Sequence, residues 1–546
     1  MKKIICFILV FVLILTLMLS SCNIAQDVES GVSESDIAQS GSELLTEPEV
    51  EASTAVNENK ENESEVEASP TETEPTETES VSETEQTDIP QSSDNEKEND
   101  IPPEINTGAN GIKLNVYTME QLYVDLSENE AATEIIELAA YKKYLAIEDE
   151  LDVDLSLTNI AGKYTSTQVL IDAVKNKTKD VDVMMTSDYR MVEMLIQGLL
   201  DDMDRHGSID WKNGWWPKDA NDSFALNGKM YFASGELSTN YAASAHGIFY
   251  NADMMLENMT IMNIPELVLE GDWELSSMME ITSNAFSELD GIAGKSNGDI
   301  FGLEVTPHAL RAVVAGSGFK FADSSEQSDD AVIFFNDLDY KADFRSFIDK
   351  LSAYMTTNDI LGFKGNDPQN GVAFSEGRSV LLIKELRFAE KLKDIDFEWG
   401  VVPPPKLYSS DREYKTFTAT NESSTYVAVC KNSKHAEEAA EMIDVMGKYG
   451  AEYTTSAFIE SAFTKDWLEN YNGINTEMLE LIIDSVTFDK ANIFTMELNV
   501  VDITMMNDSI NGDGLSVLKG ANPFKYKNIQ NAFKKLNEKI AALDAD

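Results

Sequence analysis

Apolar and polar positions follow two regular patterns in the chain just beyond residue 110. The segment IKLNVYTM (Ile112–Met119) alternates and is rich in β-branched residues, which predicts a strand. A helix is predicted over about 129–145, a second strand over 153–159, a second helix over 166–177 and a third strand over 181–185. Strands that alternate with helices of this length imply a parallel sheet covered on both faces.

Two segments stand at the ends of predicted strands. Ligands of parallel sheets lie beyond the carboxyl ends of the strands, and TSDY (Thr186–Tyr189) directly follows the third strand. Further on, the apolar run FEWGVVPPPK (Phe397–Lys406) ends in three consecutive prolines. Because proline cannot donate a ladder hydrogen bond, this segment predicts a strand that leaves one packed unit through a stiff connector.

The N-terminus has the pattern of a secretory signal. Two lysines precede an apolar run from Ile4 to Leu19, which is short for a membrane-spanning helix. The sequence LSSC (Leu19–Cys22) resembles the lipobox of bacterial lipoproteins, and this implies cleavage after residue 21 and diacylation of Cys22. An ordinary signal peptide with an incidental cysteine is the alternative. Cys6 would leave with the signal, so Cys430 has no partner within the chain and we expect no disulfide.

Charge divides the mature chain into two regions. Between residues 23 and 105 there are 25 Asp and Glu against two Lys, and Ser, Thr and Pro fill most of the rest. We therefore expect 22–105 to be a lipidated cysteine and a disordered tether of roughly 50 Å or more. Residues 106–546 carry 72 acidic and 38 basic residues, which argues against a nucleic-acid groove. Their number exceeds what one hydrophobic core holds comfortably, so at least two lobes are expected.

Seven short motifs occur in a suggestive order within 106–546. They are the acidic residue after the third strand, NGKMYF, FYNADMM, GDW, SEGRSVLL, GVVPPPK and SKHAEEAAEMIDVM. This order resembles the extracellular solute-binding proteins of ABC importers, specifically the carbohydrate-binding group known as family 1. The resemblance covers nearly all of the chain from Ile112 to Leu543.

The resemblance implies an α/β, two-lobed fold like that of type II periplasmic binding proteins. Each lobe would hold a mixed, mostly parallel sheet flanked by helices. Lobe 1 would comprise about 112–248 and 401–450, and lobe 2 about 251–398 and 451–546. Hinge crossovers are expected near Tyr250 and Asn251, and near Pro403 and Pro404. The chain departs from many relatives at Trp273–Leu275 in the GDW helix, and the pair Trp215 and Trp216 fits only a subgroup, so the motifs do not identify the ligand.

A sugar-binding site needs flat aromatic side chains for the ring face and carboxylates or amides for the hydroxyl rim. For each aromatic candidate the alternative is a place in the hydrophobic core. The candidates at predicted strand ends or in lobe-facing loops are Asp188, Tyr189, Trp215, Trp216, Glu236, Tyr241, Trp399, Asn421 and Tyr426.

The sequence gives little support to catalysis or to a cofactor. The four histidines include no two at metal-ligand spacing, so no zinc site is expected. DGIAGKS (Asp290–Ser296) lacks the first glycine of a phosphate loop, and DIDFEWG (Asp394–Gly400) lacks the third ligand and distal glutamate of a calcium loop. We therefore expect no catalytic residues, no metal and no cofactor, and rank a secreted enzyme third.

Two hypotheses of function remain. The first is a monomeric, lipid-anchored protein on the outer face of the cytoplasmic membrane, in a Gram-positive-type envelope. It would capture a neutral mono- or oligosaccharide and deliver it to two permease subunits, and through them to a cytoplasmic ATPase. The second is a cell-surface sensor or adhesion lipoprotein with the same fold, which would present ligand to a signalling receptor.

Overall fold

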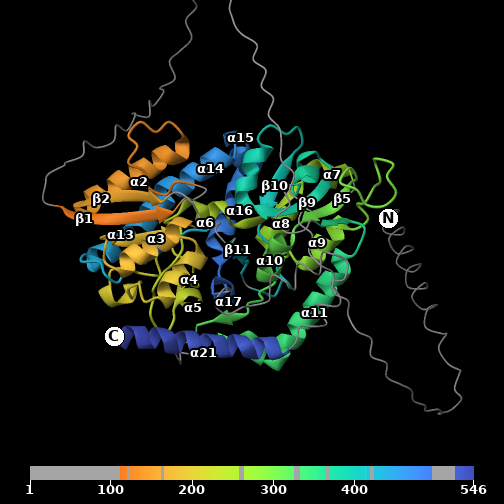
Figure 1. Ribbon diagram of the computed structural model, residues 1–546. Coiled ribbons are helices and arrows are strands. Elements are labelled where there is room, and N and C mark those ends of the chain that lie inside the picture. Colours follow the sequence, from red (N-terminus) through yellow and green to blue (C-terminus); the bar gives the residue numbers. More distant parts are fainter. Residues whose placement is uncertain are drawn as a thin grey trace, which may run out of the picture. The chain divides into compact units, whose positions relative to one another are not determined.

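The computed structural model describes residues 111–119, 123–160, 165–257, 263–324, 332–362, 369–411, 413–418, 424–494 and 523–545 (Figure 1). The predicted signal peptide, Cys22, the acidic tether and Asn421 lie outside these ranges. None of the helices within them combines the length and the apolar character needed to cross a membrane.

The first sheet has four strands in the order β12-β3-β1-β2. These are β1 (Ile112–Met119), β2 (Val153–Ile160), β3 (Val183–Thr186) and β12 (Tyr426–Val429). β1 pairs in parallel with both β2 and β3, whereas β12 runs antiparallel to β3. The strands predicted over 112–119, 153–159 and 181–185 are therefore confirmed, together with their parallel pairing.

The helices predicted between these strands are present, but one is displaced. α2 spans Ile135–Leu151 instead of about 129–145, and α3 spans Thr165–Lys175. α2 begins late because Asn129 forms a turn, in which its side chain accepts a hydrogen bond from the Ala131 amide. α2 ends where Asp152 adopts a left-handed conformation with φ of 51°. Other elements near this sheet are α4 (Asp188–Ile196), η1 (Met203–His206), α5 (Ala220–Phe224), α6 (Thr239–Ala243) and α13 (Ala436–Tyr449).

The second sheet has five strands in the order β10-β4-β9-β5-β8. They are β4 (His246–Asn251), β5 (Phe301–Val305), β8 (Ile360–Gly362), β9 (Ser379–Glu385) and β10 (Trp399–Val402). β5 is parallel to β8 and β9, and β4 is antiparallel to β9 and β10. Between these strands the chain forms α7 (Ala252–Glu257), α8 (Ile264–Glu270), α9 (Leu275–Thr282), α10 (Pro307–Gly316), η2 (Phe334–Asn336), α11 (Leu338–Met355), α12 (Val372–Ser375) and η3 (Leu386–Leu392).

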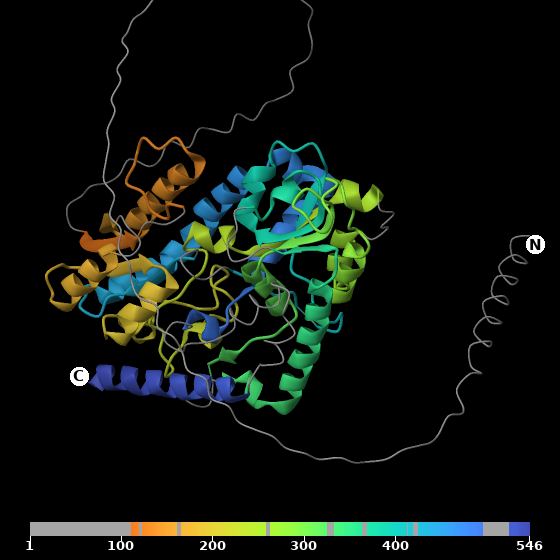
Figure 2. The same ribbon diagram turned by 45° about the vertical axis from the view of Figure 1, so that its right-hand side comes forward.

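The C-terminal region is mostly helical and touches both sheets. It contains η4 (Gly450–Thr455), α14 (Ser456–Ala462), α15 (Lys465–Glu469), η5 (Asn470–Gly473), α16 (Ile474–Asp484), α17 (Lys490–Ile493) and α21 (Pro523–Ala545). η4 and α14 lie against α2, and α21 lies against α4, as Figure 2 shows from a second side. The assignment of all of 451–546 to the second lobe stays a prediction.

Within the described residues, three segments carry the chain between the sheets. The first leads from α6 into β4. The second runs from β10 through Pro403 and Pro404 to the two-residue strand β11 (Thr416–Phe417), and then to β12. The third contains β13 (Val486–Thr487), which pairs in parallel with β11. Ala245 of the first segment bridges to Thr418 of the second, so the three segments lie side by side.

The predicted hinge position at Tyr250 and Asn251 stays a prediction, but the structure places both residues in a strand. Both residues lie within β4, where Tyr250 pairs with Gly400 on one side and Leu381 on the other. The chain has already joined the second sheet at His246, and it passes from Asn251 into α7. The motif marks the end of a strand of the second sheet, so the crossing comes about five residues earlier, around Ala245.

Candidate ligand-binding site

One edge of the first sheet brings together several residues that the sequence singled out. The carboxyl ends of the parallel strands β1 and β3 meet here, and the antiparallel strand β12 begins here. Asp188 follows β3 as the first residue of α4, is 1% exposed, and accepts a hydrogen bond from the Tyr189 amide (2.9 Å). Tyr426 begins β12 and pairs with Thr186 at the end of β3. Burial raises the pKa of the Tyr426 hydroxyl well above its usual value, and the Asp188 carboxylate raises it further.

The side chain of Tyr426 lies in an aromatic cluster. Its ring centroid is 6.0 Å from that of Phe224, 5.9 Å from Phe232 and 6.3 Å from Phe488, in edge-to-face arrangements. The hydroxyl oxygen is buried, and among the residues that the structure describes it has no hydrogen-bond partner. Most buried hydroxyls are hydrogen-bonded, so the Tyr426 hydroxyl is an exception within the described residues.

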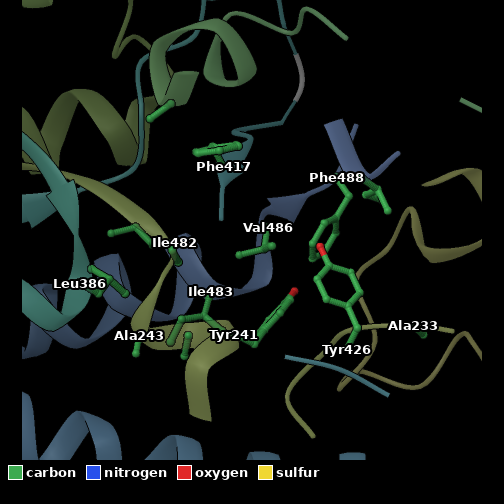
Figure 3. Close-up of a cluster of buried hydrophobic side chains, with 14 of the residues drawn as sticks. Ala233, Tyr241, Ala243, Leu386, Phe417, Tyr426, Ile482, Ile483, Val486 and Phe488 are labelled. Carbon is green, nitrogen blue, oxygen red and sulfur yellow. The ribbon is translucent and has the colours of Figure 1, made fainter. Parts of the chain in front are cut away.

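Tyr241 of α6 faces the same region. Its ring stacks on Phe488 with a centroid distance of 6.3 Å and an interplanar angle of 28°. Figure 3 shows the hydroxyl ends of Tyr241 and Tyr426 directed toward the segment that carries Val486 and Phe488. Burial raises the pKa of Tyr241 well above its usual value, and nearby carboxylates, that of Glu236 first, add to this.

The start of α6 is held by two buried charged residues. The carboxylate of Asp125 accepts hydrogen bonds from the Ser238 hydroxyl (2.8 Å) and the Thr239 amide (2.9 Å). The ammonium of Lys143 donates to the Leu237 carbonyl (2.7 Å). Burial raises the pKa of Asp125, and burial lowers the pKa of Lys143 to about 8 although Asp125 opposes this.

This anchoring places two further polar groups that sequence reasoning missed. Thr239 Oγ1 and Asn240 Oδ1 are buried, and neither has a hydrogen-bond partner in the described part of the chain. Asn240 Nδ2 lies 3.3 Å from the hydroxyl of Thr425, the residue before Tyr426. The run of three polar residues Ser238–Asn240, directly after the apolar Leu237, is the signal that could have identified them. No sequence pattern identifies Phe488 as a residue of this region.

The indoles of Trp215 and Trp216 are hydrogen-bonded to helix α13. The indole nitrogens of Trp215 and Trp216 both donate to Asp444 Oδ1 of α13, at 3.1 and 2.9 Å. Asn213 Nδ2 donates to the other oxygen of Asp444 (3.3 Å). Trp216 is only 4% exposed, so in this conformation its indole has a structural role. A ligand contact by Trp215 or Trp216 stays a prediction.

Two remaining candidates, Glu236 and Trp399, have different surroundings. The amide of Glu236 donates to the Trp215 carbonyl (2.9 Å), and burial raises the pKa of the Glu236 carboxyl to about 7, with a contribution from Asp484. Trp399, on β10 of the second sheet, stacks on Trp467 with a centroid distance of 4.8 Å. The structure thus brings Asp188, Tyr241 and Tyr426 to the edge of the first sheet. The ligand roles of these three residues and of the other candidates stay predictions.

Comparisons with known proteins identify the fold. Neither the scan against protein-family models nor the search of curated proteins finds a match. Among solved structures, a cyclo/maltodextrin-binding protein complexed with maltotetraose aligns over 79% of this chain and 98% of its own, with a TM-score of 0.50 and 11% identity. The fold is that of the two-lobed solute-binding proteins. This confirms the predicted fold class.

Two other structures align over similar lengths. A galacto-N-biose/lacto-N-biose I-binding protein of an ABC transporter from Bifidobacterium longum, in complex with lacto-N-biose, covers 79% of this chain and 98% of its own (TM-score 0.48, 14% identity). An ABC substrate-binding protein from Listeria monocytogenes, in complex with cycloalternan, covers 79% and 100% (TM-score 0.45, 14% identity). At these identities a likeness describes the course of the chain and not the ligand.

Proposed function

We propose that this protein is a lipid-anchored, extracellular solute-binding protein of an ABC importer. It captures a neutral carbohydrate between its two lobes and delivers it to membrane permeases. The fold shared with the cyclo/maltodextrin-binding protein supports the binding role. The LSSC sequence and the acidic stretch that follows it support the anchor and tether.

The observation that carries the proposal is the group of buried polar atoms at the edge of the first sheet. Tyr426 Oη, Asn240 Oδ1 and Thr239 Oγ1 have no hydrogen-bond partners within the described ranges, and the Asp188 carboxylate and the Tyr241 ring lie beside Tyr426 and Phe488. A sugar offers hydroxyls to such atoms and an apolar face to the rings. Because these atoms are sealed from solvent, the ligand would enter when the lobes separate.

The substitution Tyr426→Phe tests this site. It removes a hydroxyl that makes no hydrogen bond in the described structure, so the free energy of unfolding should stay constant or rise by about 1 kcal/mol. If a ligand hydroxyl binds there, affinity should fall by roughly 2- to 13-fold, which corresponds to one neutral hydrogen bond.

Tyr354→Phe is a matched control. The Tyr354 hydroxyl lies 2.6 Å from Thr282 Oγ1, so its removal should lower the free energy of unfolding by about 1 kcal/mol and leave the affinity unchanged. An unchanged affinity in Tyr426→Phe would remove Tyr426 from the site.

The ligand class is tested with a panel of neutral linear and cyclic oligosaccharides. A ligand at 100 times its Kd stabilises the folded state by about 2.7 kcal/mol, which a thermal-shift assay detects. Calorimetry then gives the affinity of each sugar that shifts the transition. A panel in which only peptides, polyamines or phosphorylated compounds bind would contradict the proposal.

A further inference from the structure

A short segment of the second-sheet region reaches across to elements of the first. This segment, Lys320–Ser324, is called the arm below. It follows α10, which lies against β9 and β4, and it precedes α11, which lies against β8. The helix before the arm, α10, and the next α-helix along the chain, α11, therefore both contact the second sheet.

The side chains of the arm bond to the region around α5. Lys320 Nζ lies 2.6 Å from Asp219 Oδ2, just before α5. The amide of Ser324 donates to the Asp222 carbonyl (2.6 Å), and its hydroxyl donates to the Ala225 carbonyl (2.7 Å). α5 belongs with the first sheet, because its Phe224 packs against Tyr426 of β12. The arm thus joins parts of the molecule that are built on different sheets.

The arm also binds the chain directly after the crossing strand β13. Asp489 accepts hydrogen bonds from the amides of Phe321 (2.8 Å) and Ala322 (3.2 Å). Lys490 Nζ donates to the hydroxyl of Ser324 (2.7 Å). On the other side, Asp219 Oδ2 accepts a hydrogen bond from the amide of Phe488 (3.2 Å). The Asp219 carboxylate therefore bonds both to the arm, through Lys320, and to the segment after β13, through the Phe488 amide.

These charges are shielded from water. The side chains of Lys320 and Asp219 are 12% and 17% exposed, and that of Asp323, 3.3 Å from Lys320, is 16% exposed. Burial opposes the charge on Lys320, but the carboxylates of Asp219 and Asp323 together raise its pKa. Removing the cation would leave buried carboxylates without their partner, which strongly disfavours the joined arrangement.

A cavity of about 30 Å³ lies beside the arm. Residues of the arm, of α10, of β11 and of the segment after β13 line it, including Phe321, Phe417 and Phe488. Close packing resists movement, so the unfilled space beside the crossing strands is a place where the arm meets less resistance to a small shift.

We propose that the arm is a latch between the two lobes. The Lys320–Asp219 ion pair, with the backbone bonds to Asp489, holds the lobes in the relative position seen here and sets how readily they open. The inference rests on the two-lobed fold and not on the identity of any ligand. A failure of the carbohydrate proposal would leave it standing.

Lys320→Met in the otherwise complete chain, without added ligand, tests the latch. Methionine keeps most of the length of the side chain and removes its charge. We expect a larger radius of gyration by small-angle X-ray scattering. We also expect exchange of the Phe321 and Ala322 amides to accelerate roughly tenfold or more, with exchange in β1 and β9 unchanged.

Lys434→Met is the matched control. Lys434 pairs with Asp180 at 3.4 Å, but the two side chains are 74% and 75% exposed, and such pairs contribute little. Its radius of gyration and amide exchange should equal those of the wild type.

A Lys320→Met protein that folds with wild-type radius of gyration and wild-type exchange at Phe321 and Ala322 would overturn the latch. If Lys320→Met does not fold, Ser324→Ala decides. That variant keeps the ion pair and removes the hydroxyl bonds to Ala225 and Lys490, and it should show the same two changes at smaller size. Their absence in Ser324→Ala would equally overturn the proposal.

Discussion

Substitutions of Asp444 test how much its hydrogen bonds to Trp215 and Trp216 contribute to the free energy of unfolding. Its carboxylate accepts three hydrogen bonds, two from the indole nitrogens of Trp215 and Trp216 and one from the side-chain amide nitrogen of Asn213. Asp444→Ala removes the acceptor for all three donors. Asp444→Asn keeps one oxygen that the two indoles can share, but it loses the negative charge.

The structure sets the expected size of each effect. Trp216 is 4% exposed, so without Asp444 its buried N–H finds neither a protein acceptor nor water, which costs about 1–3 kcal/mol. Trp215 and Asn213 are half-buried and can turn to water, so each loses about 0.5–1 kcal/mol. We therefore expect Asp444→Ala to lower the free energy of unfolding by about 2–5 kcal/mol, and Asp444→Asn by about 1 kcal/mol.

Urea unfolding followed by tryptophan fluorescence measures this difference, with the denaturant dependence expected to stay constant. Glu441→Ala is the control, because Glu441 lies exposed on the same helix and should change stability by less than about 0.5 kcal/mol. The reasoning fails if Asp444→Ala is as stable as Glu441→Ala. If Asp444→Ala kept its stability and lost ligand affinity, the result would support the prediction that Trp216 contacts the ligand.

Two further predictions concern pH and anchoring. Burial raises the pKa of Glu304 from its ordinary 4.5 to about 7, and its carboxylate accepts the amide of Phe374 at 2.9 Å. Because the folded-state pKa lies above the unfolded one, its favourable contribution is complete below about pH 4.5 and is lost by about pH 7. Glu304→Gln should reduce the change in the free energy of unfolding between pH 4.5 and 7 by about 3 kcal/mol at most. If the free energy of unfolding of the variant changes with pH as steeply as that of the wild type, the prediction is wrong. Cys22→Ala should release the protein into the medium or leave the precursor uncleaved. A variant that remains membrane-bound and processed would show that the lipobox prediction is wrong.

Local patterns predicted the part of the fold whose partners are close in sequence. β1, β2 and β3 alternate or form short apolar runs, and β1 has the predicted bounds. β11 and β13 escaped prediction because each has two residues and no pattern of its own, and they exist because they pair with each other. Such strands depend on contacts between distant segments, which hydrophobic periodicity does not record.

The candidate site shows the same division. Asp188 follows from the rule that ligands lie at the carboxyl ends of parallel strands, and the structure places it beside Tyr426. Trp216 is a candidate because it is an aromatic residue in a predicted loop. Its indole binds Asp444, which lies 228 residues away in sequence. A buried donor can be interpreted only when its acceptor is known, and a single sequence does not supply that acceptor.

The prolines after β10 show that a local pattern can predict the end of a strand correctly without locating the place where the lobes are joined. Pro403 and Pro404 do end a strand of the second sheet, as their missing amide protons require. The point at which the lobes are joined is set elsewhere, where Ala245 bridges to Thr418 and β11 pairs with β13. Since these three segments are bonded to one another, no single crossing can rotate alone. Movement of the lobes must displace all three together, and the arm, which binds directly after β13 through Asp489, is therefore positioned to resist or permit that movement.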